Sequence, residues 1–228
     1  MNTHATRSQI IDFMARQTGD EKHDASATSV LDVLSALYGD VLDVSPDALD
    51  DPDRDRFYLS KGHGPMAYFA VLAAYGFFDP DVLPTFRDYD SPLGLHPDRL
   101  RVPGVEISSG SLGHGLALAV GTALAVRLHR NTGRMIALLG DAEFDEGSNA
   151  EAIAVAGRFG LDGLTAVVVD NRSASLGWPG GIGARFAVEG WGTTTVEGGD
   201  RDALVTALRH RDPRRPHAVV VRVADKAA

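Results

Sequence analysis

The stretch MIALLGDAEFDEGSNAEAIAVAGRFGLDGLTAVVVDN, residues 135–171, decides the fold of this chain. Two runs of consecutive apolar residues, at 135–140 and 165–170, have the length of strands that are buried on both faces. Between them, residues 149–160 place small and apolar residues at helical spacing. A buried strand, a helix and a second buried strand form a βαβ unit, whose strands are parallel. The stretch therefore predicts an α/β fold in three layers, a parallel sheet flanked by helices on both faces.

The same pattern continues outward from this unit. Residues 79–105 hold five of the eleven prolines and predict an ordered irregular segment. Ser26 or Thr28 is expected to cap the second helix of the chain. Beyond the βαβ unit we expect helices at residues 7–17, 26–42, 65–76, 111–127 and 201–210, and strands at 56–60 and 217–223. We find no internal repeat, and we expect residues 1–228 to form a single domain.

Composition and charge exclude several classes of partner and site. The formal net charge of −9 argues against nucleic acid or an anionic membrane as the main partner, because both require a basic face. The absence of cysteine excludes disulfides, zinc–thiolate sites and iron–sulfur clusters held by this chain. No apolar run approaches the roughly 18 residues of a membrane span. We expect a cytoplasmic protein that neutralises any bound phosphate with a metal or with backbone N–H groups.

Two polar residues follow the two buried strands. Asp141 comes directly after the first strand and Asn171 after the second. Neighbouring parallel strands end at the same sheet edge, so these side chains are expected to meet there. A carboxylate and an amide oxygen suit a hard divalent cation that also binds a diphosphate. An aspartate after a strand is also common as a helix cap, and Asp-Asn is common in turns, so these residues alone leave a structural role open.

Four segments in order resemble those of transketolases, which are thiamine diphosphate enzymes. The stretch that begins with GDAEFDEG (140–147) and ends with VVVDN (167–171) resembles the thiamine diphosphate motif. That motif opens with Gly-Asp-Gly and closes near an asparagine turn. The other three segments are SKGHG (60–64), LGLHP (93–97) and SSGSLGHGLALAVG (108–121). The resemblance covers roughly residues 7 to 225 and implies the diphosphate-binding domain of that family.

In the acidic run 140–147 the glycine stands one position too late for a calcium-binding EF-hand loop.

The resemblance implies a metal site made by three residues. Asp141 and Asn171 match the family's Mg²⁺ ligands, and the backbone carbonyl of Ser173 matches the third protein ligand. Ca²⁺ or Mn²⁺ is expected to substitute for Mg²⁺. This agrees with the site expected from the ends of the two strands.

The resemblance also implies contacts to the cofactor. His63 matches a histidine that binds the diphosphate, and Gly140, Ala142 and Asn171 match positions beside it. Gly110 and Leu112 match positions that contact the aminopyrimidine and thiazolium rings. The residues alone also allow His63 to be an ordinary histidine in a glycine turn.

Three further residues match positions near the reacting atoms. His96 resembles a histidine that contacts the donor's hydroxyl groups, and His23 matches a histidine near the reacting carbon. Glu146 matches an acidic residue at the interface between the two halves of the active site, although by itself it reads as a solvated glutamate at a helix start. The chain departs from the family at KHDASATS (22–29), which is one residue shorter than the usual segment, and at Ala142, where glycine is usual.

The expected function follows from what the matching segments contain. Full transketolases continue into a pyrimidine-binding domain and a C-terminal domain, whereas this sequence ends at VVVRVADKAA. We therefore expect the N-terminal subunit of a two-component transketolase that moves a two-carbon ketol unit between a ketose and an aldose, with sugars or sugar phosphates as substrates. Its partner is expected to carry the pyrimidine-binding domain, in a heterotetramer with two copies of each chain. The alternatives are a related acyl or ketol transferase subunit of specialised metabolism, and a non-catalytic paralogue that binds the cofactor.

Overall fold

The computed structural model describes residues 5–17, 25–62, 64–174 and 177–223. It contains a sheet of five parallel strands, which confirms the predicted fold class. The strands lie in the order β1-β2-β3-β5-β4. Their bounds are β1 Arg56–Leu59, β2 Met135–Gly140, β3 Leu164–Asp170, β4 Gly192–Glu197 and β5 His217–Arg222.

Seven α-helices are found in the described residues: α1 Arg7–Arg16, α2 Ala25–Ala36, α3 Pro65–Ala74, α4 Gly115–His129, α5 Gly147–Phe159, α6 Gly181–Val188 and α7 Arg201–Arg209. Short helical turns of other types are η1 Leu37–Val41, η2 Pro46–Ala48, η3 Pro80–Thr85 and η4 Asp141–Asp145. No helix in the described ranges is long and apolar enough to cross a membrane.

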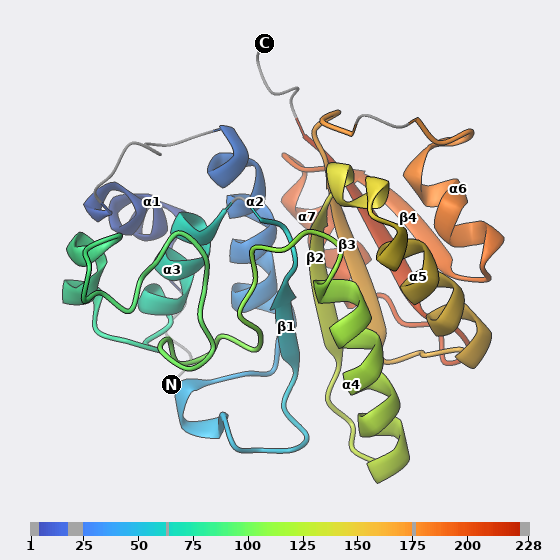
Figure 1. The fold of residues 1–228 in the computed structure, drawn as a ribbon, viewed down its shortest axis with the longest axis horizontal. Helices are drawn as coiled ribbons and strands as arrows, with labels where there is room; N and C mark the ends of the chain where they lie inside the picture. The colour runs from blue at the N-terminus through green and yellow to red at the C-terminus, as the bar shows by residue number, and fades with distance from the viewer. Residues whose placement is uncertain (1–4, 18–24, 63, 175–176, 224–228) are drawn as a thin grey trace.

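Alternate side chains of β1, β2, β3 and β5 enter two separate cores. Ile136 and Leu138 of β2 pack into the core beneath α1, α2, α3 and α7, while Met135, Ala137 and Leu139 pack into the core beneath α4, α5 and α6. Figure 1 shows α2 and α3 on one side of the sheet and α4, α5 and α6 on the other. Burying one such aliphatic side chain completely stabilises the fold by about 1.5–3 kcal/mol relative to leaving it exposed to water. The continuous apolar runs in the sequence result from this burial on both faces.

The helices predicted at 26–42 and 111–127 differ in their bounds from the structure. The helix expected at 26–42 begins at Ala25, so neither Ser26 nor Thr28 stands before it as a cap, and its last turn is the π-helix η1. The helix expected from residue 111 begins at Gly115 instead. Gly113 has a φ of 80°, which an α-helix cannot contain, so a turn precedes α4.

Two elements between residues 172 and 200 were not expected from the sequence. They are α6 and β4, and β4 forms an edge of the sheet because it pairs only with β5. Only Gly192 and Val196 of β4 are buried, and the strand contains three threonines. A strand with one sheet neighbour and so little apolar content produces no apolar run, which explains why it was missed.

His217, at the start of β5, is a buried histidine held in its neutral form. Its side chain is 4% exposed, and its Nε2 lies 3.0 Å from Oγ1 of Thr194. Burial, together with the neighbouring charges of His210 and Arg215, lowers the pKa of His217 to about 4 against the opposing effect of Asp212. The folded protein therefore resists protonation of this residue in mild acid.

We expect this histidine to destabilise the fold as the pH falls. Between the unfolded value of 6.5 and the folded value of about 4, the unfolded chain binds a proton that the folded chain does not. The free energy of unfolding should therefore fall by about 2 kcal/mol between pH 7 and about pH 4.5 through His217 alone. Urea unfolding at both pH values measures it. His217→Gln should lose less stability on acidification than wild type or the exposed control His129→Gln, and equal losses in all three would contradict the assignment.

Candidate functional site

Asp141 lies at the carboxyl edge of the sheet, where the sequence placed it. The register pairs Gly140 at the end of β2 with Val169 of β3. The carboxylate of Asp141 is 1% exposed and accepts four hydrogen bonds from its own loop and from the loop after β3. The donors are the N–H of Ala142 at 2.9 Å, the N–H and hydroxyl of Ser173 at 2.6 Å each, and the N–H of Ala174 at 3.1 Å. Asp141 thus joins the two loops that were expected to share a site.

Asn171 supplies the second feature of this edge. Its side chain is 6% exposed, and its Oδ1 is buried without a hydrogen-bond partner among the described residues. A buried carbonyl oxygen with no donor is costly, and a cation is one group that would satisfy it. All the lone pairs of Asp141 accept hydrogen bonds, so a metal would have to displace one donor. The rotatable hydroxyl of Ser173 is the donor that moves most easily.

The predicted ligands would hold a hard cation only together with oxygen ligands from a bound diphosphate or from water. No group of three or more His, Cys, Asp or Glu side chains able to hold a metal occurs within the residues that the structure describes. The predicted set contains one carboxylate, one amide and one backbone carbonyl. Mg²⁺ is commonly held by one or two carboxylates together with substrate phosphates and water, so such a set suits it when a diphosphate is present.

The turn before α4 packs against two other predicted segments. Gly110 has a φ of 125°, and a methyl group placed on it would lie 2.7 Å from Cγ of His96. A methyl group on Gly62 would lie 3.2 Å from Cδ2 of Leu112. His96 and Leu112 are exposed. Residues from SKGHG, LGLHP and SSGSLGHG are therefore in close contact, although they are far apart in the sequence.

Glu146 lies beside the same turn. It is exposed at the start of α5, and its Cβ would be 2.7 Å from a methyl group on Gly113. The hydroxyl of Ser148 donates to the carbonyl of Gly113 at 2.8 Å. These contacts hold the start of α5 against the turn before α4. His23 and His63 lie outside the described residues.

No sequence pattern predicts a role for Glu143, yet its side chain is as buried as that of Asp141. It is 1% exposed and accepts hydrogen bonds from Ser60, Gly113 and Gly140. Burial raises the pKa of Glu143, opposed by these three hydrogen bonds and by the charge of Lys61. Nothing in the run DAEFDE distinguishes Glu143, because the groups that enclose it come from distant segments.

Lys61 was also missed. Its side chain is 7% exposed and lies over the end of β2, where a methyl group on Gly140 would be 3.4 Å from Cγ of Lys61. Its positive charge acts on Glu143 at this edge of an otherwise acidic protein. In the sequence, only the glycines and His63 of SKGHG distinguish this segment, and no local pattern indicates that Lys61 is buried.

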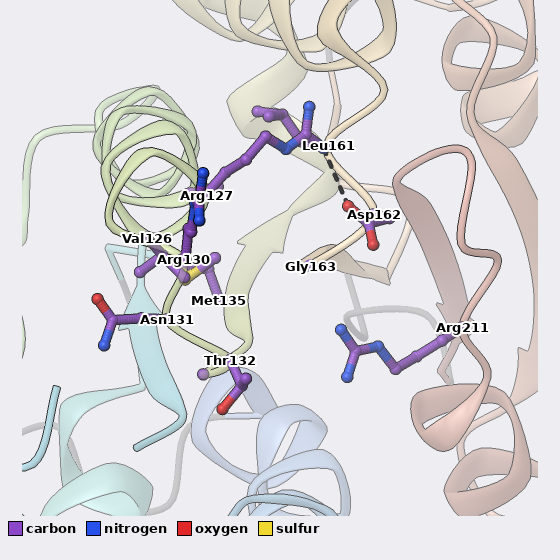
Figure 2. A pocket seen from close by; sticks show the side chains of 12 residues that line it. Val126, Arg127, Arg130, Asn131, Thr132, Met135, Leu161, Asp162, Gly163 and Arg211 are labelled. Atoms are coloured by element: carbon purple, nitrogen blue, oxygen red, sulfur yellow. Dashed lines mark hydrogen bonds and ion pairs between the residues drawn. The ribbon is translucent and has the colours of Figure 1, made fainter. Parts of the chain in front are cut away.

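A separate cavity lies at the opposite edge of the sheet. It has a volume of about 380 Å³ and is lined by Arg127, Arg130, Arg211, Met135 and Leu161 among others. Figure 2 shows Arg127 directed to Asp162, with which it forms an ion pair at 2.9 Å. None of the predicted site residues lines this cavity.

Comparisons with known proteins agree with this arrangement. A family model described as transketolase, thiamine diphosphate binding domain, matches residues 3–224. The chain is 53% identical over 217 residues to a protein of Rhodococcoides fascians named ferredoxin fas2, covering 95% of this chain and 71% of that protein. It is 35% identical over 205 residues to a subunit of an apulose-4-phosphate transketolase from Actinobacillus succinogenes, covering 87% of this chain and 74% of that subunit.

A solved structure gives the same result for the fold. A transketolase mutant from Pichia stipitis superimposes with a TM-score of 0.83 at 25% identity, over 97% of this chain and 35% of that chain. This chain thus spans about a third of the length of that solved transketolase. On the family model, the relatives and the parallel sheet together, the chain belongs to the transketolase family, as a thiamine diphosphate-binding domain.

Proposed function

We propose that this chain is the diphosphate-binding subunit of a two-component transketolase. It would bind Mg²⁺ and the diphosphate of thiamine diphosphate for ketol transfer from a ketose to an aldose, with sugar phosphates as the substrate class. The observation that carries the proposal is the buried, unpartnered Oδ1 of Asn171, in the loop after β3 whose Ser173 and Ala174 hydrogen-bond the buried carboxylate of Asp141. This is the edge where parallel sheets bind ligands. We propose that residues 1–228 form one domain with this role.

The residues proposed to hold the cofactor surround that pair. Asp141, Asn171 and the carbonyl of Ser173 would bind the metal, and His63, Gly140 and Ala142 would lie at the diphosphate. Ala142 is not among the described residues with positive φ, so its methyl group introduces no backbone strain where the family usually has glycine. Gly110 and Leu112 would contact the rings. When bound, thiamine diphosphate would supply the nucleophilic carbon that carries the two-carbon fragment.

His96 is the residue proposed to face the donor. Its ring lies against Gly110 and is exposed, so its nitrogens remain accessible to the hydroxyl groups of a sugar. His23 is proposed to lie near the reacting carbon. Glu146 is proposed to reach the partner chain, and its exposure at the start of α5 is compatible with this.

The proposed partner surface is the outer face of α4 and α5. Leu118 and Leu128 of α4 are 50% and 80% exposed, and Phe159 at the end of α5 is 54% exposed. A methyl group on Gly121 would meet nothing within 4 Å, so this part of α4 is open to close approach. Exposed large apolar residues on neighbouring helices are common at interfaces. The Actinobacillus succinogenes relative is named as one subunit of its enzyme, which supports a second chain here, and we propose a heterotetramer with two copies of each chain.

A related ketol or acyl transferase subunit of specialised metabolism is the second candidate. The name of the same relative, which specifies apulose-4-phosphate, favours a donor outside the common sugars. The Rhodococcoides fascians relative is named a ferredoxin, but this sequence contains no cysteine to hold an iron–sulfur cluster. We therefore do not propose electron transfer by this chain.

Calorimetric titration of the purified chain with thiamine diphosphate tests the proposed function. Binding is expected with Mg²⁺ present and is expected to disappear when EDTA removes the metal, because the metal joins the diphosphate to Asp141 and Asn171. Thiamine without the diphosphate serves as the control ligand and should not bind. Equal binding of thiamine and thiamine diphosphate, or binding unaffected by EDTA, would contradict the proposal.

A further inference from the structure

Glu143 joins three segments of the proposed cofactor site through its carboxylate. Oε1 accepts from the hydroxyl of Ser60 at 2.6 Å and from the N–H of Gly113 at 3.1 Å, while Oε2 accepts from the N–H of Gly140 at 2.9 Å. Ser60 follows β1, Gly113 belongs to the turn before α4, and Gly140 ends β2. We propose that Glu143 is a positioning residue that fixes the relative placement of these segments, and with it the shape of the cofactor site.

The network extends beyond the carboxylate on both sides. The hydroxyl of Ser60 accepts a hydrogen bond from the N–H of Gly115 at 3.1 Å, which ties the first residue of α4 to the end of β1. The side-chain amide of Asn149 in α5 donates to the backbone carbonyl of Glu143 at 2.7 Å. Glu143 is therefore held at its own backbone while it holds the other segments. Its side chain cannot shift without moving at least one of them.

The packing leaves little room for any other arrangement. A methyl group on Gly115 would lie 2.3 Å from Cβ of Ser60, and one on Gly113 would lie 2.6 Å from Oγ of Ser148. These segments are in direct contact, so a change in their hydrogen bonds changes their spacing. Glu143 itself is enclosed, and we infer that it acts through Gly113 and Gly140 without touching the cofactor.

The network requires a carboxylate at this position. Both oxygens of Glu143 act as acceptors, and two of their three donors are backbone N–H groups, which can only donate. An amide has one acceptor oxygen, and its NH₂ group would face either Gly140 or the pair formed by Ser60 and Gly113. Glutamine therefore loses at least one hydrogen bond and places two donors against each other. Buried hydrogen bonds to a charged group are the expensive ones to lose.

The inference rests on the proposed function, and one titration separates the two. Glu143→Gln is expected to weaken the binding of thiamine diphosphate with Mg²⁺ about tenfold, the ratio that corresponds to one lost hydrogen bond of this kind. The matched control is Glu151→Gln, the same change at an exposed position of α5, which should bind like wild type. Circular dichroism verifies the fold of each variant.

The stoichiometry of the titration distinguishes positioning from a purely structural role. A variant that has only lost stability would contain fewer competent molecules, so the number of sites per chain would fall while the dissociation constant stayed unchanged. Loss of positioning is expected to leave the number of sites unchanged and to raise the dissociation constant. Lost sites at an unchanged dissociation constant would overturn the inference.

Ser60→Ala provides a second variant, which removes the hydroxyl with its hydrogen bonds to Glu143 and from Gly115 and leaves Cβ in place. It should also weaken cofactor binding, and the double variant with Glu143→Gln should be weakened less than the product of the two single effects, because both changes disrupt one network. Multiplicative effects, or cofactor affinity unchanged in both single variants while wild type binds, would overturn the inference. A wild-type chain that binds no thiamine diphosphate would instead contradict the proposed function, and the inference with it.

Discussion

Replacing Asp141 by alanine is expected to abolish Mg²⁺-dependent binding of thiamine diphosphate. The variant loses the one carboxylate of the proposed metal site, and it also releases the amides of Ser173 and Ala174 that Asp141 holds after β3. Both effects act on the same loop, so we expect the dissociation constant to rise more than about a hundredfold. Titration calorimetry with and without Mg²⁺ measures it.

The fold of Asp141→Ala should persist, since Asp141 belongs to neither of the two cores. The matched control is Asp47→Ala, in the exposed turn η2, which should bind as wild type does. Circular dichroism of both variants shows whether the sheet is retained. Mg²⁺-dependent binding with unchanged affinity in Asp141→Ala would remove this residue from the metal site.

The sequence predicted the parts of the fold that depend on local pattern. The βαβ unit of β2, α5 and β3 produces apolar runs and helical spacing, because both faces of the strands are buried. The approach of Asp141 to the loop after β3 followed from topology, since neighbouring parallel strands end at one edge. The rule that parallel strands end at one sheet edge, where ligands bind, was sufficient to predict this approach.

The features that were missed are created by tertiary contacts. Glu143 is enclosed by Ser60 and Gly113, more than 25 positions away in the chain, so no local pattern identifies it. The edge strand β4 is recognisable only from its pairing with β5. The cap expected at Ser26 or Thr28 was wrong because α2 begins at Ala25. The individual site roles of His96, Glu146 and the cofactor contacts stay predictions.

The partner surface can be tested on α4 itself. Leu118→Asp places a charge on an exposed apolar position of the proposed partner surface, so it should weaken assembly with the partner chain by more than about tenfold. The matched control is Val188→Asp on α6, where the side chain is 79% exposed and lies outside the proposed surface. Light scattering of each variant mixed with the partner measures assembly. Equal assembly by both variants would place the interface elsewhere.

The most direct test of the split-enzyme account is ketol transfer by the purified chain before and after addition of a partner that carries the pyrimidine-binding domain. The proposed site would hold the metal and the diphosphate, and we propose that the residues that activate the aminopyrimidine belong to the partner, so the purified chain is expected to be inactive without it. With the partner present, product analysis should show ketol transfer, and light scattering should show a complex of two copies of each chain. Transfer by this chain alone, at a rate that the partner does not change, would contradict the account.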